Sequence, residues 1–496
     1  MSRKPGWYHP VVPSRSRTKS RTIFVSLLVL VVAGAVAYLG WRQSVPGLRA
    51  TVTAPRAIGH KSTIPLVVEA TRGQVARVEA RVIQNDKSAL ALTQDGALGP
   101  RLQIPLAIDS ATLGLSEGAA TLEIWGRDDY WRPLRQRDRV VASIPLTVDL
   151  TPPRLELVAS TQYLAPGGVG VIVFRAADPG RADAPAGRAD APVARAEASV
   201  GSVTFPSFPA GAHERVALVA LPYDFVAGTS IKISAQDEAG NVASRAVAAE
   251  ILPRRFRHDR IEVKDAFLEA KVPELLPQRP PGQPLVDGFL VINRDLRRQA
   301  EEAKRSLAAK TADKPLWEGA FVQPPNTKVF SNFAETRTYR YGGREIDTQV
   351  HLGFDLASTK QAPVPAANKG TVVFVGPLTI YGNAVVVDHG WGLMTLYGHL
   401  STIGVKVGDS VNREQELGRS GDTGLAVGDH IHYEVLVNGV SVTPVEFWDA
   451  KWIRDRFNGP LKAAGLTVIA GVGESGGGKA TREAPARPRA RARRAR

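Results

Sequence analysis

Hydrophobic residues form one long uninterrupted run near the start of the chain. Residues 22–41 (TIFVSLLVLVVAGAVAYLGW) contain no charged side chain and lie between Arg21 and Arg42. A helix of this length rises about 30 Å, which matches the thickness of the hydrocarbon core of a membrane. We therefore predict a transmembrane helix over 22–41. The basic segment 1–21 should remain in the cytoplasm, so the rest of the chain is exported.

The same run has a second interpretation, a signal peptide that is removed after export. Ala35-Val36-Ala37 resembles the small-residue site at which such peptides are cut. The basic segment before the run is long, however, and apolar residues continue past Ala37. Both features favour a retained anchor. We expect a single-pass protein of a bacterial inner membrane, with a cytoplasmic N-terminus and its other domains in the periplasm or elsewhere outside the cytoplasm.

Short apolar runs separated by Gly, Pro and Asp fill residues 47–252. This spacing is typical of antiparallel β-sandwiches, and we predict one sandwich over 47–150 and a second over 151–252. A turn-forming DEAGN stretch at 237–241 lies between two β runs of the second domain. It resembles bacterial immunoglobulin-like modules, which implies a spacer rather than an activity.

The pattern changes again after the second sandwich. Residues 253–314 begin rich in Pro and Arg and then show a charged helical periodicity within Asp287–Ala309. We predict a linker with a helix that either packs on its neighbour or covers a groove. Dense β runs return from about Phe321 to Asp449, within a last domain predicted over 315–460. In this domain Asn438-Gly439 between two valine-rich runs predicts a tight hairpin. The Gly-, Ala- and Arg-rich residues 473–496 predict a disordered tail.

Charge and cysteine content remove several classes of function. The chain has a net charge of +15, of which residues 1–21 contribute +6 and residues 475–496 contribute +7. The middle of the chain is thus nearly neutral, and we expect no nucleic-acid partner. The basic tail is either simply solvated or binds an anionic polymer. The chain has no cysteine, which excludes disulfides, a cysteine nucleophile and thiolate-bound zinc.

Five of the nine histidines lie within residues 351–432. The sequence HLGFD at 351–355 brings a histidine and a carboxylate close together, although this pattern alone is weak evidence for a metal site. The sequence HIH at 430–432 opens a predicted strand, so both imidazoles point to one face. Two imidazoles on one face are costly to bury unless a metal uses their lone pairs. The alternative is an exposed strand face.

Together these residues suffice for one catalytic zinc site. Such a site takes three protein ligands from His and carboxylate side chains and leaves a fourth position open. His351, Asp355 and one histidine of the pair at 430 and 432 supply three ligands. The other histidine of the pair and His399 then lie beside the metal, where a general base and an oxyanion-stabilising group are needed.

Further motifs extend this pattern over residues 331–437. They include HLGFDLA at 351–357, TLYGHLS at 395–401 and GDHIHYEV at 428–435. In order, spacing and identity they resemble the lysostaphin-type zinc metallo-endopeptidases of bacterial cell walls. The resemblance does not cover the N-terminal half of the chain.

This resemblance implies specific roles for five residues. It makes His351, Asp355 and His432 the ligands of one zinc ion per chain, and His399 and His430 the catalytic pair. Non-catalytic members of the family lose one or more of these five residues, whereas this chain keeps them all. The resemblance therefore favours an active enzyme.

Four further residues are candidates for supporting roles. His389 fits the family pattern as a strand-end packing residue or as a support for a ligand. Glu434 shares the face of its strand with a histidine two residues earlier, and we expect it to orient that imidazole. Tyr381 and Asn383 are candidates for lining the substrate groove.

The resulting prediction is a mostly β protein. It has an N-terminal transmembrane helix, two β-sandwich (immunoglobulin-like) spacer domains and a C-terminal antiparallel β peptidase domain. The implied function is zinc-dependent hydrolysis of peptide cross-links of peptidoglycan during cell-wall remodelling. The expected partners are peptidoglycan stem peptides and cross-links, the inner membrane through residues 22–41, and an anionic wall polymer at the basic tail. The alternative function is a catalytically silent, membrane-anchored activator or scaffold for another cell-wall hydrolase.

Overall fold

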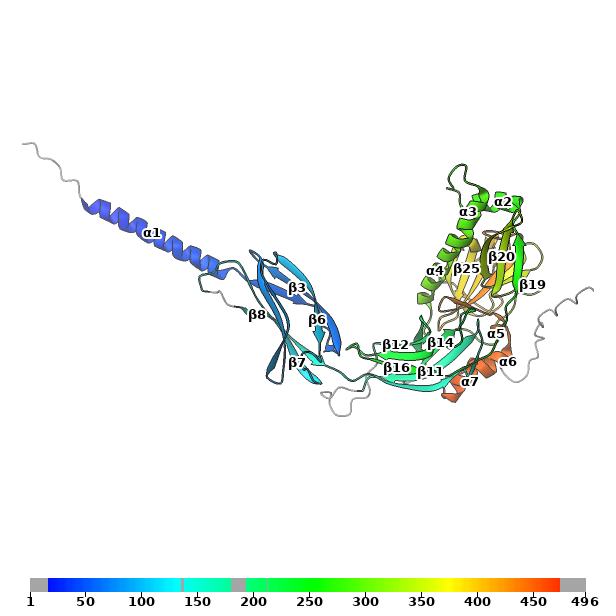
Figure 1. The fold of residues 1–496 in the computed structure, drawn as a ribbon, viewed down its shortest axis with the longest axis horizontal. Coiled ribbons are helices and arrows are strands. Elements are labelled where there is room, and N and C mark those ends of the chain that lie inside the picture. Colours follow the sequence, from blue (N-terminus) through cyan, green and yellow to red (C-terminus); the bar gives the residue numbers. More distant parts are fainter. Residues whose placement is uncertain (1–16, 135–137, 180–192, 212, 473–496) are drawn as a thin grey trace, which may run out of the picture. The chain divides into compact units, whose positions relative to one another are not determined.

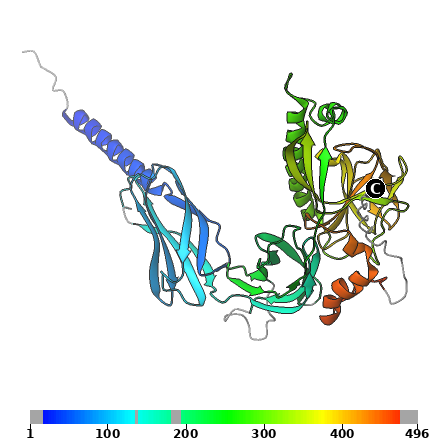
Figure 2. The ribbon, with the colours of Figure 1, turned by 45° about the vertical axis from the view of Figure 1, so that its right-hand side comes forward.

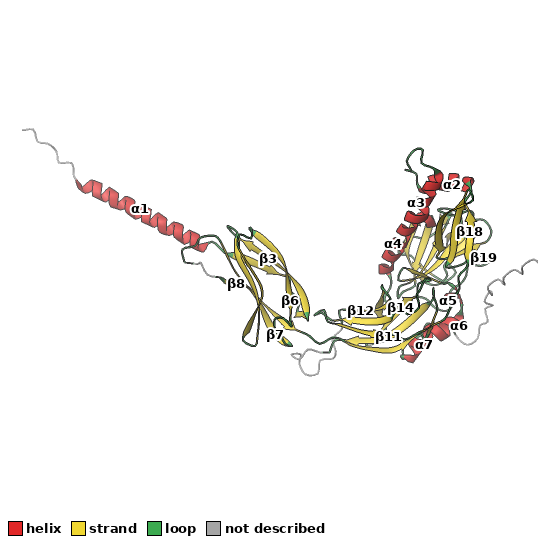
Figure 3. Cartoon of the chain, in the orientation of Figure 1, coloured by secondary structure: helices red, strands yellow, loops and turns green. Residues whose placement is uncertain are grey.

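The computed structural model describes residues 17–134, 138–179, 193–211 and 213–472. The predicted tail 473–496 and most of the basic segment 1–21 lie outside these residues. Strands dominate the described chain, and the helices fall into an N-terminal, a central and a C-terminal group (Figure 3). The helices are α1 (Arg17–Ser44), α2 (Asp265–Leu275), α3 (Leu285–Val291), α4 (Arg297–Leu307), α5 (Val445–Trp448), α6 (Ala450–Trp452) and α7 (Asn458–Ala463).

Two compact units make up the chain. The first contains the residues up to Thr151 together with Glu238–Asn241, and the second contains nearly all the remaining residues. In the first unit, α1 contains an apolar stretch over Ile23–Ser44 that is long enough to cross a membrane. Its side chains there are not buried against the rest of the chain. An N-terminal apolar helix is present as predicted, three residues longer at its end.

The first unit continues as a sandwich of two sheets around one core. The core side chains alternate along the strands and include Ile64, Leu66, Val78, Leu122 and Val148. The prediction that this domain is immunoglobulin-like stays a prediction. One sheet has the order β1-β3-β6 and the other β2-β8-β7-β4-β5. The strands are β1 (Leu48–Val52), β2 (Ala57–Ile58), β3 (Lys61–Ala70), β4 (Val75–Gln84), β5 (Lys87–Asp95), β6 (Arg101–Asp109), β7 (Gly118–Asp128) and β8 (Arg139–Val148).

The second unit begins with another β domain. Its main sheet has the order β16-β15-β12-β13-β14-β11-β9, and a short parallel pair joins β10 to β17. The immunoglobulin-like prediction for this domain also stays a prediction. Its strands are β9 (Arg154–Ser160), β10 (Tyr163–Leu164), β11 (Val169–Ala177), β12 (Arg195–Val200), β13 (Val203–Pro209), β14 (Glu214–Ala220), β15 (Ile231–Gln236), β16 (Val242–Ala246) and β17 (Glu250–Ile251).

The C-terminal part is built on one large antiparallel sheet. Its order is β19-β22-β30-β26-β25-β24-β28, and β31 pairs with β30. Two three-stranded sheets, β18-β20-β21 and β23-β29-β27, flank it. The strands are β18 (His258–Glu262), β19 (Lys328–Ser331), β20 (Glu335–Tyr341), β21 (Arg344–His351), β22 (Phe354–Ala357), β23 (Pro363–Pro365), β24 (Gly370–Pro377), β25 (Asn383–Asp388), β26 (Leu393–Gly398), β27 (Thr402–Ile403), β28 (Ser410–Val411), β29 (Glu416–Arg419), β30 (Ile431–Val437) and β31 (Val440–Val442).

The predicted hairpin is confirmed. Val437 pairs with Val440 across a two-residue turn. Asn438 and Gly439 have φ values of 49° and 79°, so both adopt the left-handed conformation that a tight turn between twisted strands requires.

The stretch predicted as a linker with a helix, 253–314, is packed onto the C-terminal sheet. Its strand β18 runs parallel to β20. Its helical part is continuous from α3 through a π-helical turn into α4. Buried residues of these helices, including Phe289, Ile292 and Ala300, belong to one hydrophobic core with Leu396 and Leu436 of the sheet. Figures 1 and 2 show α3 and α4 alongside this sheet from two directions.

A second hydrophobic core is shared by the second β domain and the C-terminal part. It joins buried residues of β11 and β14 to residues of the large sheet and of the C-terminal helices. Polar contacts follow the same seam. The amide of Thr443 donates to the carbonyl of Gly167 at 2.7 Å, and the Thr161 hydroxyl donates to the carbonyl of Arg456 at 3.1 Å. The second β domain and the C-terminal sheet are therefore packed together rather than merely tethered.

Candidate metal centre

Strand register gathers the chemically active side chains at one end of the large sheet. Asp355 on β22 lies directly opposite His432 on β30. Gly398, the last residue of β26, lies opposite His432 on the other side, so His399 follows immediately beside it. His351 ends β21, and His430 directly precedes β30. Antiparallel pairing thus brings together residues that are up to 81 positions apart.

Three donor atoms form a small triangle. The Nε2 atom of His351 lies 2.9 Å from Oδ1 of Asp355 and 3.0 Å from Nδ1 of His432. The remaining side, from His432 Nδ1 to Asp355 Oδ1, is 3.1 Å. Zinc bound tetrahedrally to nitrogen and oxygen at about 2.0–2.1 Å separates its ligands by about 3.3 Å. The triangle is close to that size.

The other nitrogen of each ligand imidazole is already occupied. Nδ1 of His351 lies 3.0 Å from the carbonyl of Asn332, and Nε2 of His432 lies 2.8 Å from a carboxylate oxygen of Glu434. These oxygens only accept hydrogen bonds, so the protons belong on those nitrogens. The nitrogens inside the triangle therefore present lone pairs to each other. A cation at this point satisfies them, so the donor set fits a metal ion.

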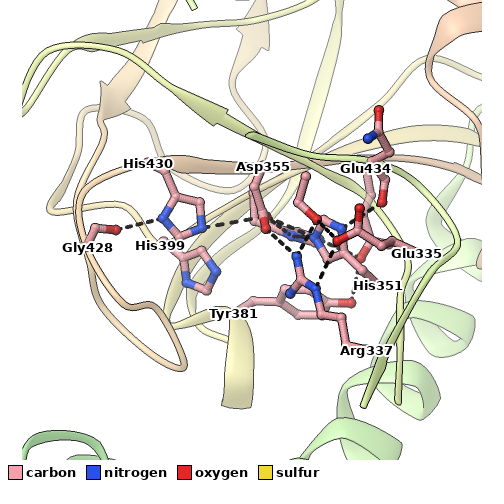
Figure 4. Close-up of polar contacts among 12 residues, drawn as sticks. Glu335, Arg337, His351, Asp355, Tyr381, His399, Gly428, His430 and Glu434 are labelled. Atoms are coloured by element: carbon pink, nitrogen blue, oxygen red, sulfur yellow. Dashed lines mark hydrogen bonds and ion pairs between the residues drawn. The ribbon is translucent and has the colours of Figure 1, made fainter. Parts of the chain in front are cut away.

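Two more imidazoles lie beside the triangle, as Figure 4 shows. The rings of His399 and His430 are 4.7 Å apart between centroids. Nδ1 of His399 lies 2.7 Å from the carbonyl of Thr423, and Nδ1 of His430 lies 2.7 Å from that of Gly428. The Nε2 atom of each ring takes no part in these backbone hydrogen bonds. The Nε2 atom of His430 lies 3.5 Å from Asp355 Oδ1.

Arg337 on β20 fixes the carboxylate of the triangle. Its Nη2 atom donates to Oδ2 of Asp355 at 2.7 Å, which leaves Oδ1 for the triangle. It also donates to the hydroxyl of Ser331 at 2.6 Å. Burial alone raises the pKa of Asp355, but the neighbouring His351 and the contacts of the carboxylate with the imidazoles outweigh burial and hold that pKa well below its ordinary value. Asp355 is therefore ionised, as a metal ligand must be.

The imidazoles differ in their preference for a proton. Burial lowers the pKa of His351, although Asp355 opposes the change. Burial and the neighbouring histidines hold the pKa of His399 well below its ordinary value. Burial also acts to lower the pKa of His432, but the carboxylates of Asp355 and Glu434 beside its ring raise it overall. His399 in particular is neutral near pH 7 and carries a lone pair on Nε2.

A fully buried charge network lies behind His432. Oε1 of Glu434 accepts hydrogen bonds from His432 and from the Tyr381 hydroxyl, the latter at 2.5 Å. Oε2 lies 2.9 Å from Nζ of Lys304 on α4 and 2.9 Å from the hydroxyl of Ser441. Burial alone raises the pKa of Glu434, but Lys304 and His432 lower it overall. Glu434 thus lies against the His432 imidazole, and its role in orienting that ring stays a prediction.

The centre is largely enclosed by protein. His351, Asp355, His399 and His432 are each between 3% and 5% exposed. The side chain of His430 is more open, at 15%. Solvent therefore reaches the group mainly from the side of His430.

The remaining sequence candidates are placed differently. Tyr381 packs its ring 4.8 Å from that of His432. Asn383 donates to the carbonyl of Leu400 at 3.2 Å, in the turn that follows His399. His389 lies apart from the centre. Its ring bonds the carbonyl of Lys369 and the hydroxyl of Thr395, and burial lowers its pKa to about 4. Among the described residues, His389 has no bond to the triangle.

Sequence reasoning missed two groups that the structure brings to the centre, Arg337 and Lys304. Arg337 had no distinguishing pattern. Lys304 did have one, because it lies one helical turn from Ala300 and one from Leu307, on the buried stripe of α4. A lysine on such a stripe indicates a buried cation that needs an acidic partner.

The fold and the centre define a class of protein. A buried His–Asp–His group with two further imidazoles beside it, on an antiparallel sheet, fits a metal ion that assists hydrolysis. Sequence comparison is more specific. Residues 349–444 match the model of peptidase family M23. The chain therefore carries an M23 peptidase domain.

Curated relatives align with part of the chain. The chain is 40% identical over 97 residues to the DD-carboxypeptidase/endopeptidase Mpg of Neisseria meningitidis, covering 20% of this chain and 22% of that protein. It is 39% identical over 119 residues to the peptidoglycan DD-endopeptidase ShyA of Vibrio cholerae, covering 24% and 27%. The chain thus matches about a quarter of the length of these relatives.

Two solved structures align with parts of the chain at low TM-scores. A putative peptidase M23 from Pseudomonas aeruginosa aligns with a TM-score of 0.35 and 23% identity, covering 57% of this chain and 94% of that one. The catalytic domain of lysostaphin from Staphylococcus simulans aligns with a TM-score of 0.22 and 29% identity, covering 25% and 92%.

Proposed function

We propose that this protein is a zinc-dependent endopeptidase that hydrolyses peptide cross-links of peptidoglycan. The observation that supports this most directly is the triangle of His351 Nε2, Asp355 Oδ1 and His432 Nδ1, whose lone pairs converge beside two free imidazoles. The relatives named DD-endopeptidases suggest the bond type, a link between two D-configured centres of the peptide cross-bridge.

In this proposal zinc, when bound, supplies a Lewis acid that acidifies water and polarises the scissile carbonyl. The other steps belong to residues of the chain. Nε2 of one of His399 and His430 accepts a proton from the attacking water, and the other imidazole hydrogen-bonds the developing oxyanion. The carbonyls of Thr423 and Gly428 hold both rings with Nε2 toward the centre.

We further propose that α1 is a retained anchor in the bacterial inner membrane. The N-terminus would then be cytoplasmic and the peptidase domain periplasmic. The two β domains would separate the anchor from the catalytic centre. The basic segment 1–21 before the apolar run supports this orientation, because positively charged flanks stay in the cytoplasm.

The test is digestion of purified peptidoglycan by the full-length protein, followed by mass spectrometry of the released fragments. Cross-linked dimers should decrease and monomers increase, and a chelator should abolish the change. Asp355→Ala should lose zinc and activity together. His399→Ala should retain zinc and lose turnover by at least about 100-fold. His60→Ala, which changes an exposed histidine of the first β domain, should resemble the wild type.

The same experiment distinguishes this proposal from the rival function. A silent activator or scaffold would bind no zinc and release no fragments on its own. It would only accelerate digestion by a second hydrolase. Hydrolysis by His399→Ala at the wild-type rate would be consistent with the proposed hydrolase function but would overturn the assignment of His399 to the catalytic pair.

A further inference from the structure

The loop between β7 and β8 is fastened to the end of α1. Nε of Arg42 donates to the carbonyl of Trp131 at 3.2 Å, and the guanidinium lies 4.4 Å from the ring centre of Tyr130. The amide of Leu134 donates to the side chain of Gln43 at 3.1 Å. The loop therefore stays at the level of the last turn of the helix.

A buried arginine strengthens the attachment. Nε and Nη2 of Arg132 donate to the carbonyls of Val45 and Pro46 at 3.1 and 3.0 Å, in the segment that leaves the helix. Arg132 also pairs with Asp128 at the end of β7. The loop, the helix end and the sheet are thus connected by bonds to both backbone and side chains.

The outer surface of this loop is apolar and aromatic. Leu134 is 85% exposed and Trp131 is 49% exposed. On the adjoining last turns of α1, Tyr38 and Trp41 are each 50% exposed, and the guanidinium of Arg72 lies 5.8 Å from the Trp41 ring. Tryptophan, tyrosine and arginine together at the end of an apolar helix are typical of the boundary between lipid headgroups and acyl chains.

Resting on the membrane anchor proposed above, we propose that residues 130–134 form a second membrane contact, which lies in the lipid interface where α1 leaves the bilayer. Trp131 and Leu134 enter the headgroup and upper acyl region, while Arg42 and Arg132 hold the loop from the protein side. The occupant of this surface is the bilayer that holds α1. These two contacts together would restrict the orientation of the first β domain relative to the membrane.

The absence of cysteine in the wild-type chain allows a direct test. Full-length Leu134→Cys carries a nitroxide spin label and is reconstituted in vesicles of phosphatidylethanolamine and phosphatidylglycerol. The matched control is Leu90→Cys, which replaces another exposed leucine (51%) on β5 of the same domain. Accessibility to lipid-soluble oxygen and to a water-soluble nickel chelate is measured by electron paramagnetic resonance.

The label at 134 should collide several-fold more with oxygen relative to nickel than the label at 90. Equal, water-like profiles at both positions would overturn the proposal. A label at 134 that is shielded from both reagents would also overturn it, because that result indicates a second protein copy on this surface.

A separate observation concerns Lys304, which comes from α4, outside the residues that match the M23 model. It is fully buried, with Nζ 2.7 Å from Glu301, 2.9 Å from Glu434, and 3.1 Å from the hydroxyls of both Tyr381 and Ser441. The Lys304 ammonium therefore links these four side chains into one hydrogen-bonded network.

Resting on the function proposed above, we infer that Lys304 is a positioning residue for the metal centre. It holds one oxygen of Glu434, so that the other oxygen accepts the Nε2 proton of His432. That bond fixes the ring with Nδ1 toward His351 and Asp355. An element outside the peptidase core thus sets the geometry of a ligand.

Zinc affinity, measured by competition with a chromophoric chelator, tests this inference without any substrate. Lys304→Met should weaken zinc binding by about 10–100-fold and lower kcat with little change in KM. Lys310→Met, which changes an exposed lysine just after the same helix, is the matched control and should leave both unchanged.

The double variant Lys304→Met/Glu434→Gln covers the case in which the single variant leaves an uncompensated buried charge and unfolds. It removes both charges, so its circular dichroism melt should be cooperative while its zinc affinity stays reduced. Wild-type zinc affinity in a folded Lys304→Met or in the double variant would overturn the inference. That outcome would leave the proposed hydrolysis itself untouched.

Discussion

At the scale of single residues, the centre depends on close backbone approach as much as on its ligands. Gly353 lies between His351 and Asp355 on the chain. A Cβ atom there would lie 2.6 Å from the carbonyl oxygen of Tyr433 and 2.7 Å from Nε2 of His432. Its neighbours are a backbone group and a ligand ring, which cannot move without disturbing the triangle.

Gly353→Ala should therefore reduce zinc affinity and activity by at least about tenfold and destabilise the fold by about 1–3 kcal/mol. Zinc titration and thermal melting measure both effects. Gly459→Ala on α7 is the control, because a Cβ there meets no heavy atom within 4 Å. It should keep full activity and gain up to about 1 kcal/mol of stability. Equal zinc affinity in both variants would contradict this account.

Arg337 is the second single-residue prediction. Removing its bond to Asp355 with Arg337→Gln frees the carboxylate to rotate away from the triangle. Zinc affinity or activity should fall by about 10–100-fold, as measured by chelator competition and fragment release. Arg344→Gln, on an exposed side chain of the next strand, should have no effect. A normal zinc affinity in Arg337→Gln would show that other contacts orient Asp355.

The sequence could single out the five central residues because their motifs, in order and spacing, resemble a known family, whereas each motif alone is weak evidence. It could not predict Arg337, whose role arises only because β20 pairs with β21 and brings its guanidinium to Asp355. The sequence could have indicated that Lys304 is buried and needs an acidic partner, because it lies on a buried helical stripe. It could not identify that partner, because Glu434 is 130 residues away.

At the scale of elements, local signals predicted well and long-range pairings did not. The Asn438-Gly439 hairpin follows from the conformational freedom of two adjacent residues. Strand β18 does not, because it pairs in parallel with β20, so that His258 lies opposite Thr336. Such a pairing depends on how the residues between the two strands fold, which no local pattern reveals. The Pro- and Arg-rich residues around β18 instead suggested a linker.

The contact of α5 with the second β domain has a pH-dependent component. Glu446 on α5 accepts a hydrogen bond from the amide of Val169 at 2.9 Å and pairs with Arg254 at 3.0 Å. Burial raises the pKa of Glu446 to about 7, although Arg254 and the Val169 amide act to lower it. In the unfolded chain the same carboxyl titrates near its ordinary value of 4.5.

The native state therefore holds this proton at pH values at which the unfolded state has lost it. The free energy of unfolding should fall as the pH rises from about 4.5 to about 7, by about 3 kcal/mol from this group. Denaturant unfolding of the full-length protein across this range measures the slope. Glu446→Gln should flatten it, whereas Glu345→Gln, on an exposed side chain, should not. An unchanged slope in Glu446→Gln would contradict the assignment.

At the scale of the whole molecule, charge is concentrated at the two ends of the chain. Deleting residues 475–496 removes seven net positive charges. If the tail binds an anionic wall polymer, sedimentation with purified cell walls should decrease at low salt and match the wild type at high salt, because salt screens exposed charges. A tail with every Lys and Arg replaced by Gln is the length-matched control and should behave like the deletion. Unchanged sedimentation at low salt would mean that the tail is only solvated.

The core shared by the second β domain and the catalytic sheet determines which recombinant fragments can be soluble. A fragment that starts at residue 315 would expose to water the apolar side chains that Phe174 and Leu218 normally help to cover, and it would also lack Lys304. The smallest piece worth producing for crystallisation or inhibitor screening therefore starts near Pro152 and ends near Val472.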